Sequence, residues 1–228
     1  MSDSERLISK LINDKPMFHT WSELPPVGPE ILRFIARNVS RGMTTLETGA
    51  GHTTVIFAIA GARHTCIAPA NDEFDKIVAY CSRAGVDLSG VRFIDESSDR
   101  ALPRDGTVPS ELDFVFIDGA HRLPFPLIDY HYTGASLKVG GLLGLDDMEM
   151  PSVRQLYTFL DGEDEWELVD AIHDAAFFRK IAHVKIIRDW AGQKINRKEN
   201  WATPNWKPHW GKRIRNKTVR VVRALGLR

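Results

Sequence analysis

Hydrophobic and polar positions along this chain alternate between two periods. Short apolar runs of strand length are each followed by a stretch whose apolar residues recur at helical spacing. The runs of strand length are, in order, 43–48, 63–68, 91–95, 113–118 and 140–146. Such alternation is typical of a parallel sheet that carries helices on both of its faces.

Helical spacing occupies the segments between these runs and also the segments before the first of them. Ser2 and Glu5 have the spacing of a capping box at the start of a short helix. Pro29 suits the first turn of a second helix, because proline lacks the N–H that this turn leaves unpaired. Further helices are predicted over 53–62, 72–85, 126–138 and 151–162.

The pattern changes after residue 162. Residues 165–186 contain two strand-like segments in direct succession, with a turn predicted at His173 and Asp174. A hairpin at this point places one antiparallel strand near an edge of the sheet. The predicted fold class is therefore α/β, a Rossmann-like, doubly wound, seven-stranded sheet that is mostly parallel and ends in an antiparallel hairpin.

Three regions follow from this pattern. Residues 1–40 form N-terminal helices that cap the core, 41–188 form the Rossmann-like domain, and 189–228 form a basic tail. Residues 191–212 contain three tryptophans, and a last amphipathic segment, 212–227, places Ile214, Val221, Val222 and Leu225 on one stripe. Thr218 interrupts that stripe.

Charge separates the tail from the rest of the chain. The 228 residues hold 30 basic and 30 acidic side chains, but residues 191–228 contain eleven Lys or Arg and a single acid, Glu199. The preceding residues are correspondingly acidic. Such a tail suits three partners: a protein surface (the acidic body or a second copy in a homo-oligomer), a membrane surface or a nucleic acid, with docking on protein favoured by the aliphatic stripe.

Composition limits the compartment. A hydrophobic fraction of 43% and a charged fraction of 26% are ordinary for a globular protein. No apolar run approaches the ~18 residues that span a bilayer, and the N-terminus has no basic start followed by an apolar stretch. Cys66 and Cys81 make no disulfide framework, so a reducing, cytoplasmic location is expected.

The glycine-rich stretch Glu47-Thr48-Gly49-Ala50-Gly51 follows the first predicted strand and opens a helix. Turns at this position bind nucleotide-like ligands in doubly wound sheets. A dinucleotide fingerprint would need a third glycine, and a phosphate-binding loop would need a lysine after its last glycine; both are absent. The carboxylate of Glu47 would repel a pyrophosphate, whereas it suits a ligand that carries an ammonium group.

This E-x-G-x-G stretch resembles motif I of the class I S-adenosylmethionine-dependent methyltransferases. The order of five strand–helix units and a closing hairpin over about 28–185 is similar to the sheet of that family. The segments FVFIDGAH and GGLLGLDD resemble the small-molecule O-methyltransferases, in which acidic motifs end the fourth and fifth strands.

The resemblance implies a set of residues for the cofactor S-adenosylmethionine. It places Glu47, Gly49 and Gly51 at its methionine end and Asp118 near its sulfonium. Thr53 and Thr54 begin the following helix and would help there, and Ser97 and Ser98 would approach the adenine.

Two positions depart from the family pattern. The acid that usually ends the second strand and binds the ribose is replaced by Ala68, and Asn71, Asp72 or Glu73 would have to substitute for it. The acid that often precedes the adenine-side serine is replaced by Ser97. These departures leave room for a relative that binds without catalysing.

Three aspartates fall at the ends of two strands that are expected to be neighbours: Asp118, Asp146 and Asp147. Converging carboxylates repel unless a cation compensates them, and a divalent metal with hard oxygen ligands does so. In the O-methyltransferases that this chain resembles, these positions bind Mg²⁺, which holds the acceptor hydroxyl. The alternative is that Asp146 and Asp147 cap the next helix while Asp118 orients its loop.

Two histidines lie near these motifs. His121 follows Asp118 by three residues and is a candidate catalytic base, because imidazole titrates near ~6.5. Its alternative role is a hydrogen bond to the backbone of the loop. His19 and Trp21 precede the core and would form a lid over the ligand.

The predicted function is O-methylation of a small-molecule hydroxyl by S-adenosylmethionine, with a divalent metal that positions the acceptor. One alternative is a methyltransferase-like scaffold without activity. Another is a nucleic-acid methyltransferase that uses the tail, although Asp118-Gly119-Ala120-His121 lacks the Asn/Asp-Pro-Pro-aromatic motif of base-amine methylation. Methylation of a pyrimidine carbon needs a catalytic cysteine, usually after a proline, and neither Cys66 nor Cys81 has that context.

Overall fold

A computed structural model of the chain describes residues 2–19, 27–69, 72–183 and 193–197. The chain divides into two compact units, Met1–Arg188 and Asp189–Arg228, and each is described by itself. The described residues of the second unit contain one short 3₁₀ turn, Lys194–Asn196. The predicted amphipathic segment 212–227, Trp21 and Asn71 lie outside the described residues.

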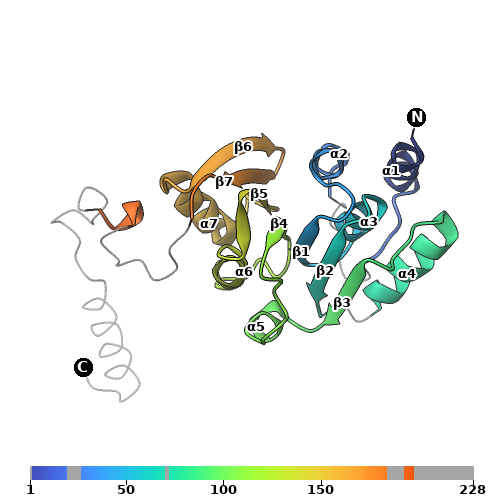
Figure 1. Cartoon of the computed structure of the whole chain (residues 1–228), viewed down its shortest axis with the longest axis horizontal. Helices are drawn as coiled ribbons and strands as arrows, with labels where there is room; N and C mark the ends of the chain where they lie inside the picture. Colours follow the sequence, from blue (N-terminus) through green and yellow to red (C-terminus); the bar gives the residue numbers. More distant parts are fainter. Residues whose placement is uncertain (1, 20–26, 70–71, 184–192, 198–228) are drawn as a thin grey trace, which may run out of the picture. The chain divides into compact units, whose positions relative to one another are not determined.

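The first unit is built on a seven-stranded sheet (Figure 1). Its spatial order is β3-β2-β1-β4-β5-β7-β6, and every pairing is parallel except those of β7 with β5 and with β6. The predicted fold class is confirmed, including the hairpin that closes the sheet. The strands are β1 Thr44–Thr48, β2 Arg63–Ala68, β3 Val91–Asp95, β4 Leu112–Ile117, β5 Leu137–Leu145, β6 Trp166–Ile172 and β7 Ala175–Lys180.

Helices cover both faces of this sheet (Figure 1). Ser2 caps the first helix through the predicted capping box, in which its hydroxyl accepts from the Glu5 N–H at 3.2 Å. Pro29 begins the second helix, as its missing N–H allows. The helices are α1 Asp3–Asp14, α2 Pro29–Asn38, α3 His52–Ile59, α4 Glu73–Ala84, α5 Ser98–Ala101, α6 Phe125–Thr133 and α7 Pro151–Gly162.

Alternating side chains of the strands divide the interior into two cores. In β4, Phe114 and Phe116 pack with α1–α4 on one face, while Val115 and Ile117 pack with α5–α7 on the other. Phe177 and Phe178 of β7 separate in the same way. This follows from the period of two in an extended strand, and it means that a strand buried on both faces is apolar throughout.

The N-terminal helices share the first of these cores. Leu11 of α1 and Ile35 of α2 are fully buried in the same cluster as Phe57 of α3. α1 and α2 therefore pack into the same core as the sheet and α3.

The junction between α6 and β5 differs from its prediction. The helix ends at Thr133 instead of residue 138, and β5 begins at Leu137 instead of Gly140. Lys180 explains the early ending, because its buried ammonium donates to the carbonyls of Gly134, Ala135 and Leu137. A charge supplied from β7 thus satisfies carbonyls that a longer helix would have paired internally.

The order of the strands creates a switch point between β1 and β4. From β1 the chain proceeds outward to β2 and β3, and it then returns to β4 on the other side of β1. Ligands of doubly wound sheets bind beyond the carboxyl ends of the strands at such a point. Among the described helices, none has the length and hydropathy needed to cross a membrane.

Candidate active site

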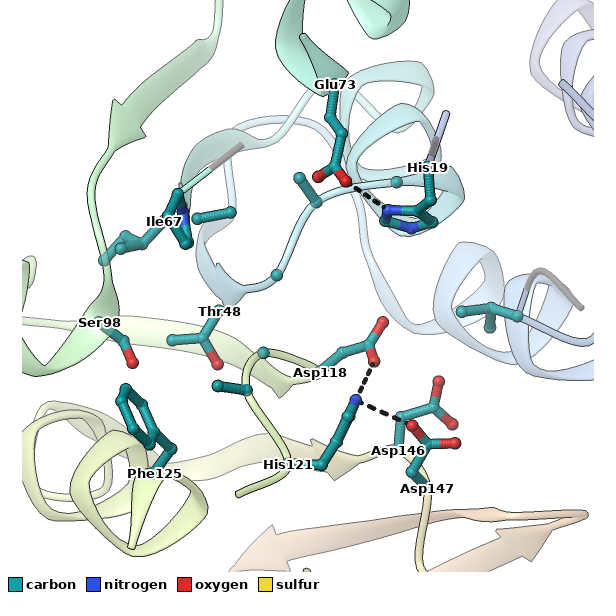
Figure 2. Close-up of a pocket in the computed structure, with 18 of the residues that line it drawn as sticks. His19, Thr48, Ile67, Glu73, Ser98, Asp118, His121, Phe125, Asp146 and Asp147 are labelled. Atoms are coloured by element: carbon teal, nitrogen blue, oxygen red, sulfur yellow. Dashed lines mark hydrogen bonds and ion pairs between the residues drawn. The ribbon is translucent and has the colours of Figure 1, made fainter. Parts of the chain in front are cut away.

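A cavity of about 430 Å³ opens at the switch point, within the range of small-molecule sites (Figure 2). Its walls include the residues that follow β1, β2, β4 and β5 and the residues that precede α2. The glycine turn, the residues after β4 and the aspartates after β5 all contribute. Its polar and charged lining residues are His19, Thr48, His52, Glu73, Ser97, Ser98, Asp118, His121, Asp146, Asp147 and Asp174.

Gly49 brings the end of β1 against the end of β4. Its φ is +99°, and a Cβ at this position would lie 2.1 Å from the carbonyl oxygen of Asp118. The Asp118 N–H donates to the carbonyl of Thr48 at 2.9 Å, so the two strand ends stay paired up to the cavity. Only glycine allows this approach, which exposes the backbone of the turn to a ligand.

Glu47 does not line the cavity, which differs from the role that the resemblance implies. Its side chain is 1% exposed and lies beneath the turn, on the face of the sheet that α3 covers. Thr53 donates to one carboxylate oxygen at 2.7 Å, and Thr54 and His64 both contact the other, the latter at 3.1 Å. The reason is the strand period, because Glu47 shares its face with Thr45 and opposes Leu46 and Thr48.

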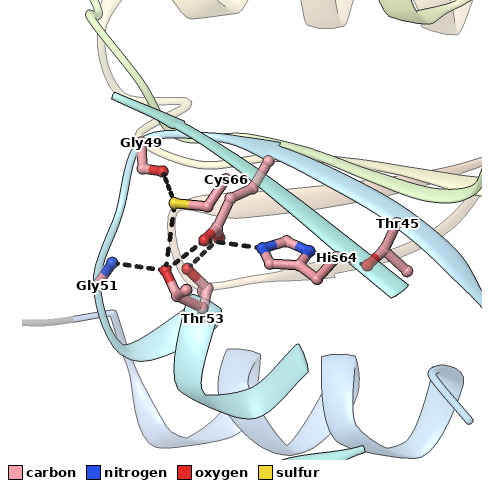
Figure 3. A network of polar contacts seen from close by, with 8 residues as sticks. Thr45, Gly49, Gly51, Thr53, His64 and Cys66 are labelled. Atoms are coloured by element: carbon pink, nitrogen blue, oxygen red, sulfur yellow. Dashed lines mark hydrogen bonds and ion pairs between the residues drawn. The ribbon is translucent and has the colours of Figure 1, made fainter. Parts of the chain in front are cut away.

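Thr53 and Thr54 are likewise absent from the cavity wall. The hydroxyl of Thr54 accepts from the Gly51 N–H at 3.0 Å while it donates to Glu47. Cys66 donates its thiol to the Gly49 carbonyl at 3.2 Å, and burial raises the pKa of that thiol well above its ordinary value. These buried groups therefore hold the turn from below, with Thr53 and Cys66 close to Gly49 and Gly51 (Figure 3). None of Thr53, Thr54 and Cys66 lines the cavity.

Ser97 and Ser98 both line the cavity, and Ser98 lies at the opposite end of it from the aspartates (Figure 2). Ser98 is buried at the start of α5, and Phe125 from α6 faces it across the cavity. The hydroxyl of Ser97 donates to Asp99. A flat ring beside two hydroxyls suits an aromatic base.

The predicted aspartates converge with His121 at the end of the cavity beside β4 and β5. The Nε2 of His121 lies 2.9 Å from Oδ2 of Asp147 and 3.9 Å from Oδ1 of Asp118. One ligand atom from each of these three residues falls within 4.8 Å of the others. Asp146, 6% exposed, follows directly from β5, and its buried Oδ1 has no hydrogen-bond partner among the described residues.

Burial and mutual repulsion disfavour the charged forms of these carboxyls. Burial, and then the charges of Asp147 and Asp174, raise the pKa of Asp146 to about 7. Burial, and then Asp146 and Asp147, raise the pKa of Asp118 well above its ordinary value. Hard oxygen donors that repel one another, one of them without a partner, fit a divalent cation.

Two titratable lining residues, His52 and Asp174, have no counterpart among the residues predicted for catalysis or cofactor binding, whereas Glu73 was one of three candidates for the ribose. His52 begins α3 and is 5% exposed; burial lowers its pKa to about 4, and its Nε2 has no partner. Glu73 begins α4, and Asp174 lies in the turn between β6 and β7. The position of His52 right after the last glycine was the available signal, while Asp174 reaches the site only through the hairpin.

Comparisons with known proteins agree with this geometry. Residues 46–148 match the family model of a methyltransferase domain, whereas no curated protein matches the sequence. A protein from Staphylococcus aureus described as a caffeoyl-CoA O-methyltransferase has a TM-score of 0.59 at 18% identity, over 80% of this chain and 93% of that chain. An O-methyltransferase of tomaymycin synthesis from Streptomyces achromogenes, solved with S-adenosylmethionine, has a TM-score of 0.58 at 17% identity, over 80% and 100%.

Similar structures also include enzymes that act on RNA. An rRNA methylase from Streptococcus thermophilus has a TM-score of 0.54 at 14% identity, over 71% of this chain and 99% of that chain. At such identities the structural likeness establishes the fold, and the family match concerns residues 46–148. Residues 46–148 thus match a methyltransferase domain in sequence, and the fold that contains them is similar to that of the O-methyltransferases.

Proposed function

We propose that this protein transfers the methyl group of S-adenosylmethionine to a hydroxyl oxygen of a small molecule. The observation that carries the proposal is the cluster of Asp118, His121 and Asp147 in the wall of the cavity that the glycine turn opens. The cluster provides both a proton acceptor and a set of oxygen ligands next to the expected position of the sulfonium.

The residues present fit the cofactor. Gly49 and Gly51 expose bare backbone, and Ser98 and Phe125 form a site for a base at the other end. His52 adds a buried nitrogen without a partner, which can pair with a polar group of the ligand. The sulfonium supplies a methyl group that is already activated for transfer.

The residues present also fit a divalent metal. Asp118, Asp146 and Asp147 would hold it through carboxylate oxygens, one of which, Oδ1 of Asp146, has no other partner. Bound there, a divalent metal would supply a Lewis acid that lowers the pKa of the acceptor hydroxyl.

His121 is the proposed base. A proton from the acceptor hydroxyl would move to the imidazole of His121, and the resulting imidazolium would be stabilised by Asp147 and Asp118, which lie 2.9 Å and 3.9 Å from its Nε2. The hydroxyl oxygen then forms a bond to the methyl carbon as the carbon–sulfur bond breaks. The electron pair of that bond stays on sulfur, and S-adenosylhomocysteine results.

Calorimetry with S-adenosylhomocysteine tests the first half of the proposal. We expect saturable binding, and its absence up to millimolar ligand would contradict the proposal and favour a scaffold without catalysis. Radiolabelled S-adenosylmethionine, offered with a panel of hydroxylated small molecules or with RNA, tests the second half. Methyl groups incorporated only into RNA would favour the nucleic-acid alternative.

His121→Asn separates chemistry from binding. We expect transfer to fall by about 10²–10⁴-fold, the usual contribution of a general base, while the affinity for S-adenosylhomocysteine changes less than twofold. His131→Asn, on the exposed side of α6, is the matched control and should keep full activity. Unchanged turnover after chelation would refute the metal while leaving the base intact.

A further inference from the structure

The end of β2 leaves a ribose without an obvious partner. β2 ends at Ala68, which lines the cavity with a methyl group only. In doubly wound sheets that bind nucleosides, a carboxylate about 20 residues after the glycine turn accepts hydrogen bonds from the ribose hydroxyls. The sequence alone leaves Asn71, Asp72 and Glu73 open for this task.

The structure separates the two acids among these candidates. Glu73, 22 positions after Gly51, is 6% exposed and lines the cavity. Asp72 is half exposed, pairs with Lys76 at 2.9 Å on the outside of α4, and does not line the cavity. The start of α4 therefore directs Glu73 into the cavity (Figure 2), whereas Asp72, its neighbour in sequence, is directed toward Lys76.

His19 holds the carboxylate of Glu73 beside the glycine turn. Its Nδ1 lies 2.8 Å from Oε1 of Glu73, and its Nε2 lies 3.4 Å from the position of a Cβ on Gly51. The neighbouring Phe18 is anchored, because its ring packs against His52 at 4.9 Å and its carbonyl accepts from Lys76 at 3.2 Å. Residues 18–19 and the first turn of α4 thus form one continuous wall.

The charge of the cavity limits the class of nucleoside. Its described lining residues include five acids (Glu73, Asp118, Asp146, Asp147 and Asp174) and no Lys or Arg. A phosphate would be repelled there, whereas neutral ribose hydroxyls and a sulfonium or ammonium would be favoured. A nucleoside without phosphates matches both the acid at Glu73 and this charge.

We infer that Glu73 binds the ribose hydroxyls of the cofactor, in place of an acid at the end of β2, and that His19 is the positioning residue for its carboxylate. The inference rests on the proposed function, because it assigns one end of the same ligand. It also accounts for Ala68 without loss of nucleoside binding.

A cycle of protein variants and ligands tests the inference with the full chain. The probes are S-adenosylhomocysteine and its 2′-deoxy analogue, titrated by calorimetry. The wild type should bind the deoxy analogue about tenfold or more weakly, as expected when one hydrogen bond to a carboxylate is lost. Glu73→Gln should weaken the binding of S-adenosylhomocysteine by a similar or larger factor, and this variant should no longer distinguish the two ligands. Asp72→Asn is the matched control and should retain both affinities.

His19 has a separate readout. His19→Ala should weaken the binding of S-adenosylhomocysteine more than the binding of the deoxy analogue. His19→Asn, which keeps a donor near Nδ1, should restore part of the difference between the two affinities. A purely structural role would weaken both ligands equally.

The melting temperature of each variant monitors its fold. If folded Glu73→Gln still discriminates the two ligands as the wild type does, the inference is wrong although the proposed function stands. If the wild type binds neither ligand, the proposed function fails as well.

Discussion

Glu47 balances its charge inside the protein, beneath the turn that it precedes. Its carboxylate contacts the hydroxyls of Thr53 and Thr54 and the imidazole of His64, and His64 in turn contacts Thr45 at 2.8 Å through its other nitrogen. A buried carboxylate is tolerated when its oxygens accept several hydrogen bonds. The carboxylate of Glu47 therefore holds groups that shape the turn, and it does not line the cavity.

Replacement of Glu47 by glutamine should therefore appear first in stability. The neighbouring Thr53 and Thr54 hydroxyls donate to the carboxylate, so the N–H groups of an amide would face donors and lack an acceptor. We therefore expect Glu47→Gln to lower the free energy of unfolding by about 1–3 kcal/mol. Urea unfolding measures this. Glu167→Gln, exposed on β6, should change it by less than about 0.5 kcal/mol. A variant as stable as this control that has lost S-adenosylhomocysteine binding would show that Glu47 contacts the ligand after all.

The decisive element of the site is the succession of β1, the glycine turn and α3. Its two glycines have different structural roles. Gly49 has a positive φ and touches the backbone of Asp118, whereas Gly51 has an extended φ of 165° and faces His19. The first glycine is therefore required by the junction of two strands, and the second keeps the cavity open.

Substitution of each glycine by alanine separates these two roles. Gly49→Ala should cost more than about 2 kcal/mol of unfolding free energy, because a Cβ would meet the Asp118 carbonyl at 2.1 Å. Gly51→Ala should cost less than about 1 kcal/mol but weaken S-adenosylhomocysteine, since its methyl group enters the cavity. Thermal unfolding and calorimetry on both variants check this. Equal losses of stability would contradict the assignment.

At the scale of the whole molecule, the described residues of the sheet domain form two cores of their own. Both cores are formed by residues between Leu11 and Phe178, on the two faces of the sheet. The excess of basic residues lies instead in the second unit, Asp189–Arg228. The tail is therefore expected to bind a partner and not to stabilise the fold of the sheet domain.

Removal of residues 189–228 tests this division. We expect the free energy of unfolding of the remaining chain to change by less than about 1 kcal/mol and the affinity for S-adenosylhomocysteine to be retained. A larger loss would indicate that the tail docks on the sheet domain or on a second copy. Binding of RNA or of anionic vesicles that disappears with the tail, and that weakens steeply with salt, would identify its partner as nucleic acid or lipid.

The fold class could be predicted from the sequence because burial on both faces of a parallel strand leaves a local, readable pattern. The runs that became β1, β2, β3 and β4 and the turn at His173 were identified within a residue or two, as were the aspartates that end β4 and β5. The same local pattern failed at the end of α6, where Lys180 from a distant strand satisfies the carbonyls.

The tertiary structure decided which polar side chains face the cavity. A motif places Glu47 and Glu73 near a ligand without stating where each side chain points. Strand alternation turned Glu47 into the interior, and the first turn of α4 turned Glu73 toward the cavity, where His19 meets it from a segment 54 residues earlier. The identity of the motif is local in the chain, whereas the direction of its side chains depends on packing between segments that only the fold brings together.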